Sequence, residues 1–210
     1  MEKIVICIGR QLGSGGRKIA KMLAEDFRCK LYDKEILNLA AKESGFSEKF
    51  FEQNDERKGF FKSLLQNHGR SVLTDNLYRN HFSQDSLFLF QSEAISKAAE
   101  EESCVFVGRC ADYVLRDNSN MVSIFITADM EDRIKAIMQR QDCSEDAARK
   151  MLSNRESARA SYYNYYTGKK WGHAESYDLC VNTSVLGIEK TEQFIKSFIL
   201  SRFPDAQQQP

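Results

Sequence analysis

Short apolar runs alternate with helical patterns along most of this chain. The runs lack polar alternation and are short enough for strands: Ile4–Ile8, Cys29–Tyr32, Cys104–Val107, Val122–Ile126 and Leu179–Val181. Helical spacing follows the first run, at Ile19, Ala20, Leu23, Ala24 and Phe27, and is clearest over Asp129–Gln141, Ser144–Tyr166 and Gly187–Arg202. Strands that alternate with helices predict a parallel sheet covered by helices on both faces.

Residues 45–102 contain no clear strand pattern and predict several helices that carry many aromatic residues. We therefore expect one domain over 1–205, with a core of 1–44 and 103–205 and a helical insertion at about 45–102. The aromatic residues are best explained as core or as a contact between copies, so a homodimer is possible. Residues 206–210 are expected to form a disordered tail.

The first apolar run leads into a glycine-rich turn, Gly13-Ser14-Gly15-Gly16, which is followed by Arg17, Lys18 and a helix. Glycines let several backbone N–H groups point at one place, and a helix start adds partial positive charge there. This order of strand, glycines, basic pair and helix predicts a phosphate-binding loop.

The loop departs from the usual spacing of Gly, four residues and Gly-Lys-Ser/Thr. Alignment on Gly13-Ser14-Gly15 puts Gly16 where the lysine belongs and Arg10 where the first glycine belongs. The sequence leaves open whether Arg17 or Lys18 supplies the missing positive charge. It also leaves open a glycine-rich turn that binds nothing.

Composition narrows the class of protein. The 210 residues are 42% hydrophobic and 29% charged, which is typical of a globular domain with a real core. Zero net charge argues against a dedicated nucleic-acid binder. No apolar stretch approaches the ~20 residues of a membrane span, and the first strand pattern starts too early for a signal peptide. We expect a cytoplasmic protein.

Cysteine and histidine give no sign of a metal site. The six cysteines include no Cys-x-x-Cys pair, and the three histidines are far apart in sequence. Cys7, Cys104 and Cys180 lie in apolar runs and are expected to be reduced and buried.

Arginines provide most of the candidate chemistry outside the loop. Arg109 follows an apolar strand pattern, and ligands of parallel sheets bind beyond the carboxyl ends of strands. Arg133 lies on a predicted helix and is a candidate phosphate ligand. Arg155 and Arg159 are four residues apart on one side of a helix, which suits a lid that closes over phosphate. Solvated surface arginines are the alternative in each case.

Two further stretches hold candidate residues. Tyr32-Asp33 ends the predicted second strand, and Asp33 is a candidate for holding water around Mg²⁺, for orienting substrate, or for capping the next helix. Residues 162–172 mix aromatic and basic side chains, as single-strand nucleic-acid binders do. Neutral overall charge favours the end of a lid instead.

Together these residues resemble the cytidylate kinase-like branch of the P-loop nucleoside monophosphate kinases. The resemblance covers most of the chain. It rests on Arg10-Gln11-Leu12-Gly13-Ser14-Gly15-Gly16-Arg17, Tyr32-Asp33-Lys34-Glu35, Gly108-Arg109-Cys110-Ala111-Asp112, Tyr162-Tyr163-Asn164-Tyr165-Tyr166, Gly168-Lys169-Lys170-Trp171 and Tyr177-Asp178-Leu179. It implies a P-loop fold of three α/β/α layers, a five-stranded parallel sheet, a helical region that binds the monophosphate, and an arginine-bearing lid at about 153–173.

The resemblance also implies ATP and Mg²⁺ as cofactors and CMP or dCMP as the phosphate acceptor. Gly13, Ser14, Gly15, Gly16 and Arg133 would bind ATP. Arg17, Lys18, Arg155 and Arg159 would stabilise the transferring phosphate. Tyr32, Asp33, Arg109 and Asp112 would contact the acceptor. Cys110 replaces an aspartate of the family's Gly-Arg-Asp motif, and Lys18 stands where a threonine would bind Mg²⁺.

Two rival interpretations remain at this stage. A nucleotide-binding regulatory protein without turnover is consistent with the altered loop. A short-chain dehydrogenase is suggested by Gly9, Gly13 and Gly15, and by Tyr166 and Lys170 with Ser153 upstream. The many arginines and the helical insertion do not suit hydride transfer.

Overall fold

The computed structural model describes residues 3–33 and 74–207. The chain divides into two compact units, Met1–Asp33 with Ala98–Pro210 and Lys34–Lys97. Within the second unit the described part is helical and belongs to α5 (Thr74–Glu101). The candidate site described below lies wholly within the first unit.

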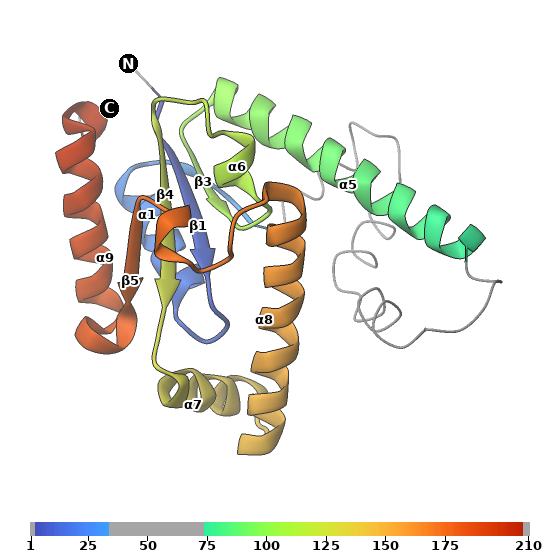
Figure 1. Cartoon of the computed structure of the whole chain (residues 1–210). Helices are drawn as coiled ribbons and strands as arrows, with labels where there is room; N and C mark the ends of the chain where they lie inside the picture. The colour runs from blue at the N-terminus through green and yellow to red at the C-terminus, as the bar shows by residue number, and fades with distance from the viewer. Residues whose placement is uncertain (1–2, 34–73, 208–210) are drawn as a thin grey trace. The chain divides into compact units, whose positions relative to one another are not determined.

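The first unit is built on a five-stranded, all-parallel sheet with the order β2-β3-β1-β4-β5 (Figure 1). The strands are β1 (Val5–Arg10), β2 (Lys30–Tyr32), β3 (Cys104–Val107), β4 (Met121–Thr127) and β5 (Leu179–Asn182). All five apolar runs therefore form strands. The predicted α/β fold with a five-stranded parallel sheet is confirmed.

Helices follow the strands in the expected places, with one short helix after β3 that the sequence did not predict. They are α1 (Gly16–Asp26), α6 (Ala111–Val114), α7 (Met130–Gln141), α8 (Glu145–Thr167) and α9 (Thr183–Arg202), with two 3₁₀-helices, η1 (Ala174–Ser176) and η2 (Pro204–Gln207). Ser144 caps α8 as predicted, because its Oγ accepts from the backbone N–H of Ala147 at 3.4 Å.

Side-chain alternation along β1 divides the core. Ile4, Ile6 and Ile8 pack in the cluster formed with residues of α1 and α9, and all three are buried. Figure 1 shows α1 and α9 beside the sheet. Cys7 points to the opposite face, where Asp112 of α6 is one of the charges near its thiol. Arg10, the last residue of β1, has the same parity as the three isoleucines, so its side chain leaves the strand on the α1 side.

The structure corrects several local expectations. Cys180 is exposed rather than buried, because β5 is an edge strand that pairs only with β4 among the described strands. Residues 74–101 form one helix, and residues 45–73 lie outside the described residues, so the prediction of several helices over 45–102 stays a prediction. Ala206 and Gln207, placed in the disordered tail by the sequence, belong to η2. No helix in the described ranges has the length and apolarity that crossing a membrane requires.

Candidate anion-binding site at the carboxyl edge of the sheet

The glycine-rich turn between β1 and α1 is held in place by hydrogen bonds from three directions. The Gln11 N–H donates to the Ile126 carbonyl of β4 at 3.0 Å. The Ser14 hydroxyl donates to the Gln11 carbonyl at 2.9 Å, and the Thr183 hydroxyl at the start of α9 donates to the Ser14 carbonyl at 3.0 Å. The turn is thus a pre-formed structure rather than a loose connection.

Close packing explains why the turn contains glycine. Gly13 has a φ of 82°, and a Cβ there would lie 2.8 Å from the backbone oxygen of Arg133. No other residue fits at this point without displacing the start of α7. The turn leads into α1, whose first N–H groups have no acceptor within the helix and carry partial positive charge. The predicted order of strand, glycine-rich turn and helix is present, and phosphate binding by this turn stays a prediction.

Four arginines gather around one carboxylate beside this turn, and we call Arg10, Arg17, Arg109 and Arg159 the arginine cluster. Asp33, which follows β2, lies 2.9 Å from Arg17 Nε and 3.9 Å from Arg10 Nη2. Burial lowers the pKa of Arg109 and Arg159, and the charge of Asp33 opposes this lowering at both guanidinium groups. Among the described residues, the charge of Asp33 acts on Arg10, Arg109 and Arg159, and that of Glu156 acts on Arg159. The concentration of guanidinium groups at one place favours binding of an anion.

The strand order brings these residues together. β2, β3 and β1 are neighbours, and Asp33, Arg109 and Arg10 stand at or just beyond their carboxyl ends. Arg159 comes from α8, and its Nη1 donates to the Arg10 carbonyl at 3.2 Å across 149 residues of sequence. The site therefore occupies the edge of the sheet where parallel α/β proteins bind ligands.

Backbone strain marks the end of β3. Gly108, Arg109 and Cys110 have φ values of 79°, 62° and 55°, three left-handed residues in a row. Each non-glycine residue there costs roughly 1–2 kcal/mol. Such strain concentrates at functional sites, and here it belongs to the turn that presents Arg109.

Burial and mutual repulsion lower the pKa of several arginines in the cluster. Burial lowers the pKa of Arg10 to about 9, with the Arg159 charge as the next cause and Asp33 opposing both. Burial also lowers the pKa of Arg109, and the pKa of Arg159 falls through burial and the nearby charge of Arg155. A bound anion would relieve this repulsion, since it favours the charged form of every group in the cluster.

Two predicted site residues, Lys18 and Tyr32, contact partners outside the arginine cluster. Lys18 Nζ pairs with Glu189 of α9 at 2.7 Å, and both side chains are exposed. Tyr32 is buried, stacks on Phe106 and donates from its hydroxyl to Glu102 at 2.9 Å. Their predicted roles with ATP or acceptor gain no support from these contacts.

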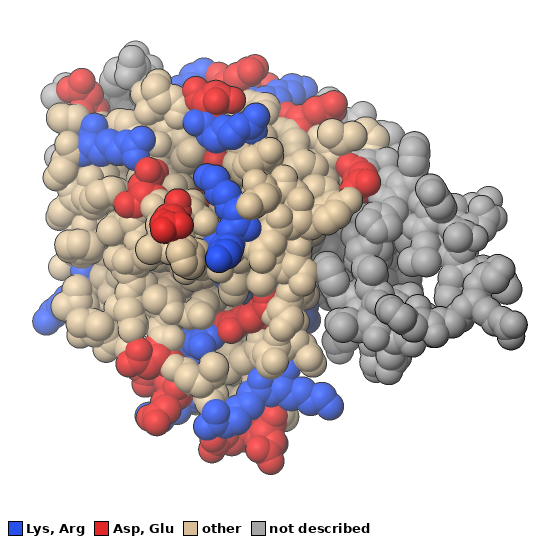
Figure 2. Space-filling view, in the orientation of Figure 1, with Lys and Arg blue, Asp and Glu red and all other residues tan. Residues whose placement is uncertain are grey.

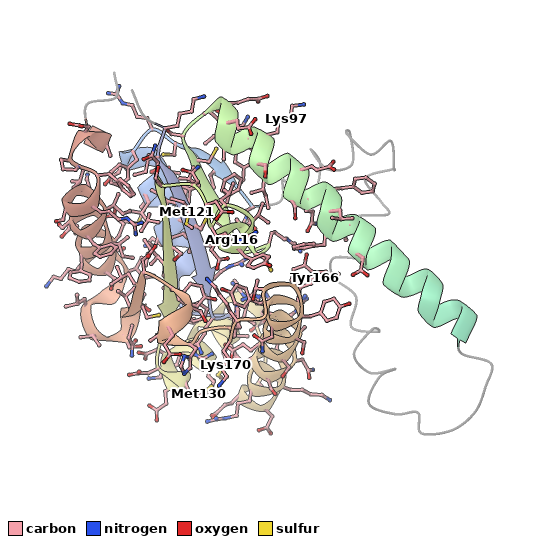
Figure 3. All side chains as sticks on the ribbon, turned by 45° about the horizontal axis from the view of Figure 1, so that its top comes forward. Lys97, Arg116, Met121, Met130, Tyr166 and Lys170 are labelled. Carbon is pink, nitrogen blue, oxygen red and sulfur yellow. The ribbon has the colours of Figure 1, made fainter. Side chains whose placement is uncertain are left out.

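Arg133 is also directed inward. It is 4% exposed, and its Nη1 pairs with Glu156 of α8. Figure 3 labels Met130 at the first residue of α7 and Tyr166 near the end of α8, the two helices that this ion pair joins. Its predicted role as an ATP ligand stays a prediction.

Asp112, a predicted acceptor-binding residue, is hydrogen-bonded to α8. It is buried at the start of α6, and its Oδ2 accepts from the Tyr163 hydroxyl of α8 at 2.7 Å. Burial is the largest cause of the raised pKa of Asp112. The carboxylate therefore connects α6 to α8, and burial of its charge destabilises the folded protein.

Asp112→Asn is expected to stabilise the protein at pH 7, because asparagine keeps an acceptor for Tyr163 and removes the buried charge. A raised pKa in the folded state means that wild-type stability falls as pH rises above the unfolded pKa of about 3.9. The gain is expected to be on the order of 1 kcal/mol at pH 7 and to vanish toward pH 4. Urea denaturation of both proteins across this pH range measures it, and a difference independent of pH would contradict the explanation.

The sequence missed several residues of this site. The sequence identifies Arg10 only as the residue at a position where the standard loop has glycine. The glycine at position 16, where the standard loop has lysine, was the signal that Arg10 could supply the missing charge. Glu156 and Tyr163 were not singled out by role. Their partners, Arg133 and Asp112, are 23 and 51 residues away, so no local pattern reveals the contacts.

Strand order decides against the dehydrogenase alternative. In the dinucleotide-binding fold β2 lies next to β1, whereas β3 separates β1 from β2 here.

Figure 2 shows basic and acidic side chains interspersed on one face of the molecule rather than gathered into one basic area. This is consistent with the neutral net charge.

Comparison with known proteins gives the family. The sequence profile of the cytidylate kinase-like family matches residues 5–185. The chain belongs to this family. Family membership supports a nucleotide-binding, kinase-like phosphotransferase. No significant match was found among curated proteins.

Solved structures agree on the fold of this cytidylate kinase-like protein. An uncharacterized protein from Eubacterium ventriosum ATCC 27560 is 32% identical with a TM-score of 0.72, over 95% of this chain and 99% of that chain. Shikimate kinase from Bacteroides thetaiotaomicron is 13% identical with a TM-score of 0.53, over 93% and 98% of the two chains. Shikimate kinase from Acinetobacter baumannii, solved with shikimate, is 12% identical with a TM-score of 0.50, over 96% and 95%. The shikimate kinases show a shared fold alone.

Proposed function

We propose that the protein transfers a phosphoryl group from ATP to a nucleoside monophosphate, with CMP or dCMP as the acceptor. The observation that carries this proposal is the arginine cluster, four guanidinium groups around Asp33 beside a phosphate-binding turn. Four guanidinium groups at one place suit two phosphorylated ligands that meet end to end.

Transfer of this kind asks the protein for positioning and charge rather than covalent chemistry. The turn and the start of α1 would hold the ATP phosphates. Arg109 would orient the acceptor phosphate, and Arg159 would contact the phosphoryl group in flight. Arg155, exposed on α8, would join them when the segment 153–173 closes as a lid. Closure would also exclude the water that hydrolyses ATP.

Mg²⁺ would accompany the ATP. No cluster of three or more metal-ligating side chains occurs in residues 3–33 and 74–207. Phosphate-transfer sites hold Mg²⁺ through one or two carboxylates, water and the substrate phosphates. Asp33 would be the carboxylate that holds the ion or its water. When bound, the ion supplies neutralising charge to the phosphates.

A panel of acceptors tests the proposal. The protein is incubated with Mg-ATP and CMP, dCMP, UMP, AMP or GMP, and nucleoside diphosphates are measured. Shikimate serves as a further acceptor, because shikimate kinases share the fold. The proposal predicts CDP or dCDP as the main product. A different diphosphate would correct the acceptor, and phosphoshikimate alone would overturn the proposal.

The altered loop favours a second candidate, a nucleotide-binding regulatory protein of the same fold. Gly16 occupies the place of the lysine that normally contacts the transferred phosphate. This candidate predicts tight ATP binding by calorimetry with no diphosphate from any acceptor.

A further inference from the structure

Two positions of the loop have exchanged residue types. A standard phosphate-binding loop has glycine at the place of Arg10 and lysine at the place of Gly16. In this chain the long cation stands at the end of β1, and the glycine stands at the first residue of α1. The exchange preserves one glycine and one cation.

The geometry shows that the two positions share one space. A Cβ built on Gly16 would lie 2.6 Å from Arg10 Cβ and 3.1 Å from Arg10 Cγ. The stem of Arg10 therefore fills the place into which a side chain at position 16 would project. Any larger residue at position 16 would collide with it, so the arginine requires the glycine.

The far end of the side chain reaches the arginine cluster. Arg10 Nη1 would lie 2.5 Å from a Cβ at Gly108, the residue that follows β3. The side chain thus crosses from the start of α1 to the end of β3, with Asp33 at 3.9 Å from Nη2. The Arg10 side chain as a whole is 21% exposed, so it is largely enclosed and still borders the surface beside Asp33.

The other two cations of the loop are less suited to this role. Lys18 is paired with Glu189 on α9, away from the cluster. Arg17 is close to Asp33, but its side chain is 69% exposed at the surface. Arg10 is the most enclosed of the three.

We propose that Arg10 replaces the phosphate-binding lysine of the loop and binds the terminal phosphates of the nucleotide from the end of β1. The inference rests on the proposed function, since it assigns a role within the same site. A guanidinium donates to two phosphate oxygens at once, whereas an ammonium acts as a point charge. The exchange therefore keeps charge at the loop and changes its geometry.

Binding of ATP and of inorganic tripolyphosphate, measured by calorimetry, tests the proposal without requiring turnover. Arg10→Met keeps much of the buried stem and removes the charge. It is expected to weaken both affinities about 10- to 100-fold, the value of a charged hydrogen-bonding group. Arg149→Met, an exposed arginine paired with Glu145 on α8, is the matched control and is expected to bind as wild type.

Restoring the standard order is the stricter test. Gly16→Lys alone is expected to impair folding or binding, because the Arg10 stem occupies its space. The double variant Arg10→Gly/Gly16→Lys is expected to bind tripolyphosphate within about threefold of wild type and at least tenfold better than Arg10→Gly. Circular dichroism confirms folding of each protein.

Wild-type affinity in a folded Arg10→Met variant, or no recovery in a folded double variant, would overturn the inference. The readouts also separate it from the proposed function. Transfer to CMP that survives Arg10→Met with unchanged ATP affinity leaves the function and removes this inference. If tripolyphosphate binding depends on Arg10 but no acceptor is phosphorylated, the inference about Arg10 stands and the proposed function is wrong.

Discussion

Arg159→Met is expected to lower kcat for phosphate transfer about 100- to 1,000-fold and to change the KM for ATP only a few-fold. Arg159 contributes from α8 to the arginine cluster, and its Nη1 is anchored on the Arg10 carbonyl at 3.2 Å. An arginine that contacts the phosphoryl group during its transfer stabilises the transition state more than the bound substrate. Steady-state kinetics with Mg-ATP and the best acceptor measures the split.

Two variants on the same helix sharpen this result. Arg155→Met is expected to have the smaller effect, because Arg155 is exposed and Arg159 is partly buried at the site. Arg149→Met, one turn and a half before Arg155, removes an exposed arginine and should leave kcat unchanged. Equal kcat in wild type and Arg159→Met would show that α8 does not supply the transition-state charge.

Glu156→Gln is expected to reduce the free energy of unfolding by about 3 kcal/mol. Glu156 pairs with Arg133, whose side chain is 5% exposed, and removal of one partner leaves a buried charge without compensation. The Arg133 Nε already has no hydrogen-bond partner among the described residues, so loss of the Glu156 carboxylate would remove the charged partner of this buried guanidinium. Urea denaturation at pH 7 measures the loss.

The double variant Arg133→Met/Glu156→Gln is expected to recover much of this stability, since no buried charge remains. The exposed pair Glu145–Arg149 on the same helix provides the control, and Glu145→Gln should cost less than about 0.5 kcal/mol. Similar losses for Glu156→Gln and Glu145→Gln would contradict the assignment of the Arg133–Glu156 pair to the core.

The sheet could be predicted from the sequence because its signal is local. Each buried parallel strand is a continuous apolar run. The strand Val5–Arg10 begins one residue after the predicted run Ile4–Ile8 and ends two residues after it, and Met121–Thr127 adds one residue at each end of the predicted run. The four-residue α6 was missed, because one helical turn contains too few positions to show a period. The kink at Gly187 (φ 76°, ψ 171°) explains why the periodic pattern of α9 begins there, although the helix starts at Thr183.

The site was predictable in composition but not in arrangement. Arg17, Arg109 and Arg159 were all identified as candidates, and the structure brings them together at Asp33. Arg10 was not, because its role depends on side-chain parity along β1 and on the space above Gly16, which only the packed strand and helix define. Lys18 and Arg133 were named for their charge, yet each pairs with an acid from a distant segment, Glu189 and Glu156.

The most direct measurement is a crystal structure of the protein with Mg²⁺ and a nonhydrolysable ATP analogue. The account predicts the triphosphate on the Gly13–Gly16 turn, with terminal phosphate oxygens within hydrogen-bond distance of the Arg10 and Arg159 guanidinium groups. An analogue bound elsewhere, with the turn and the arginine cluster empty, would contradict it.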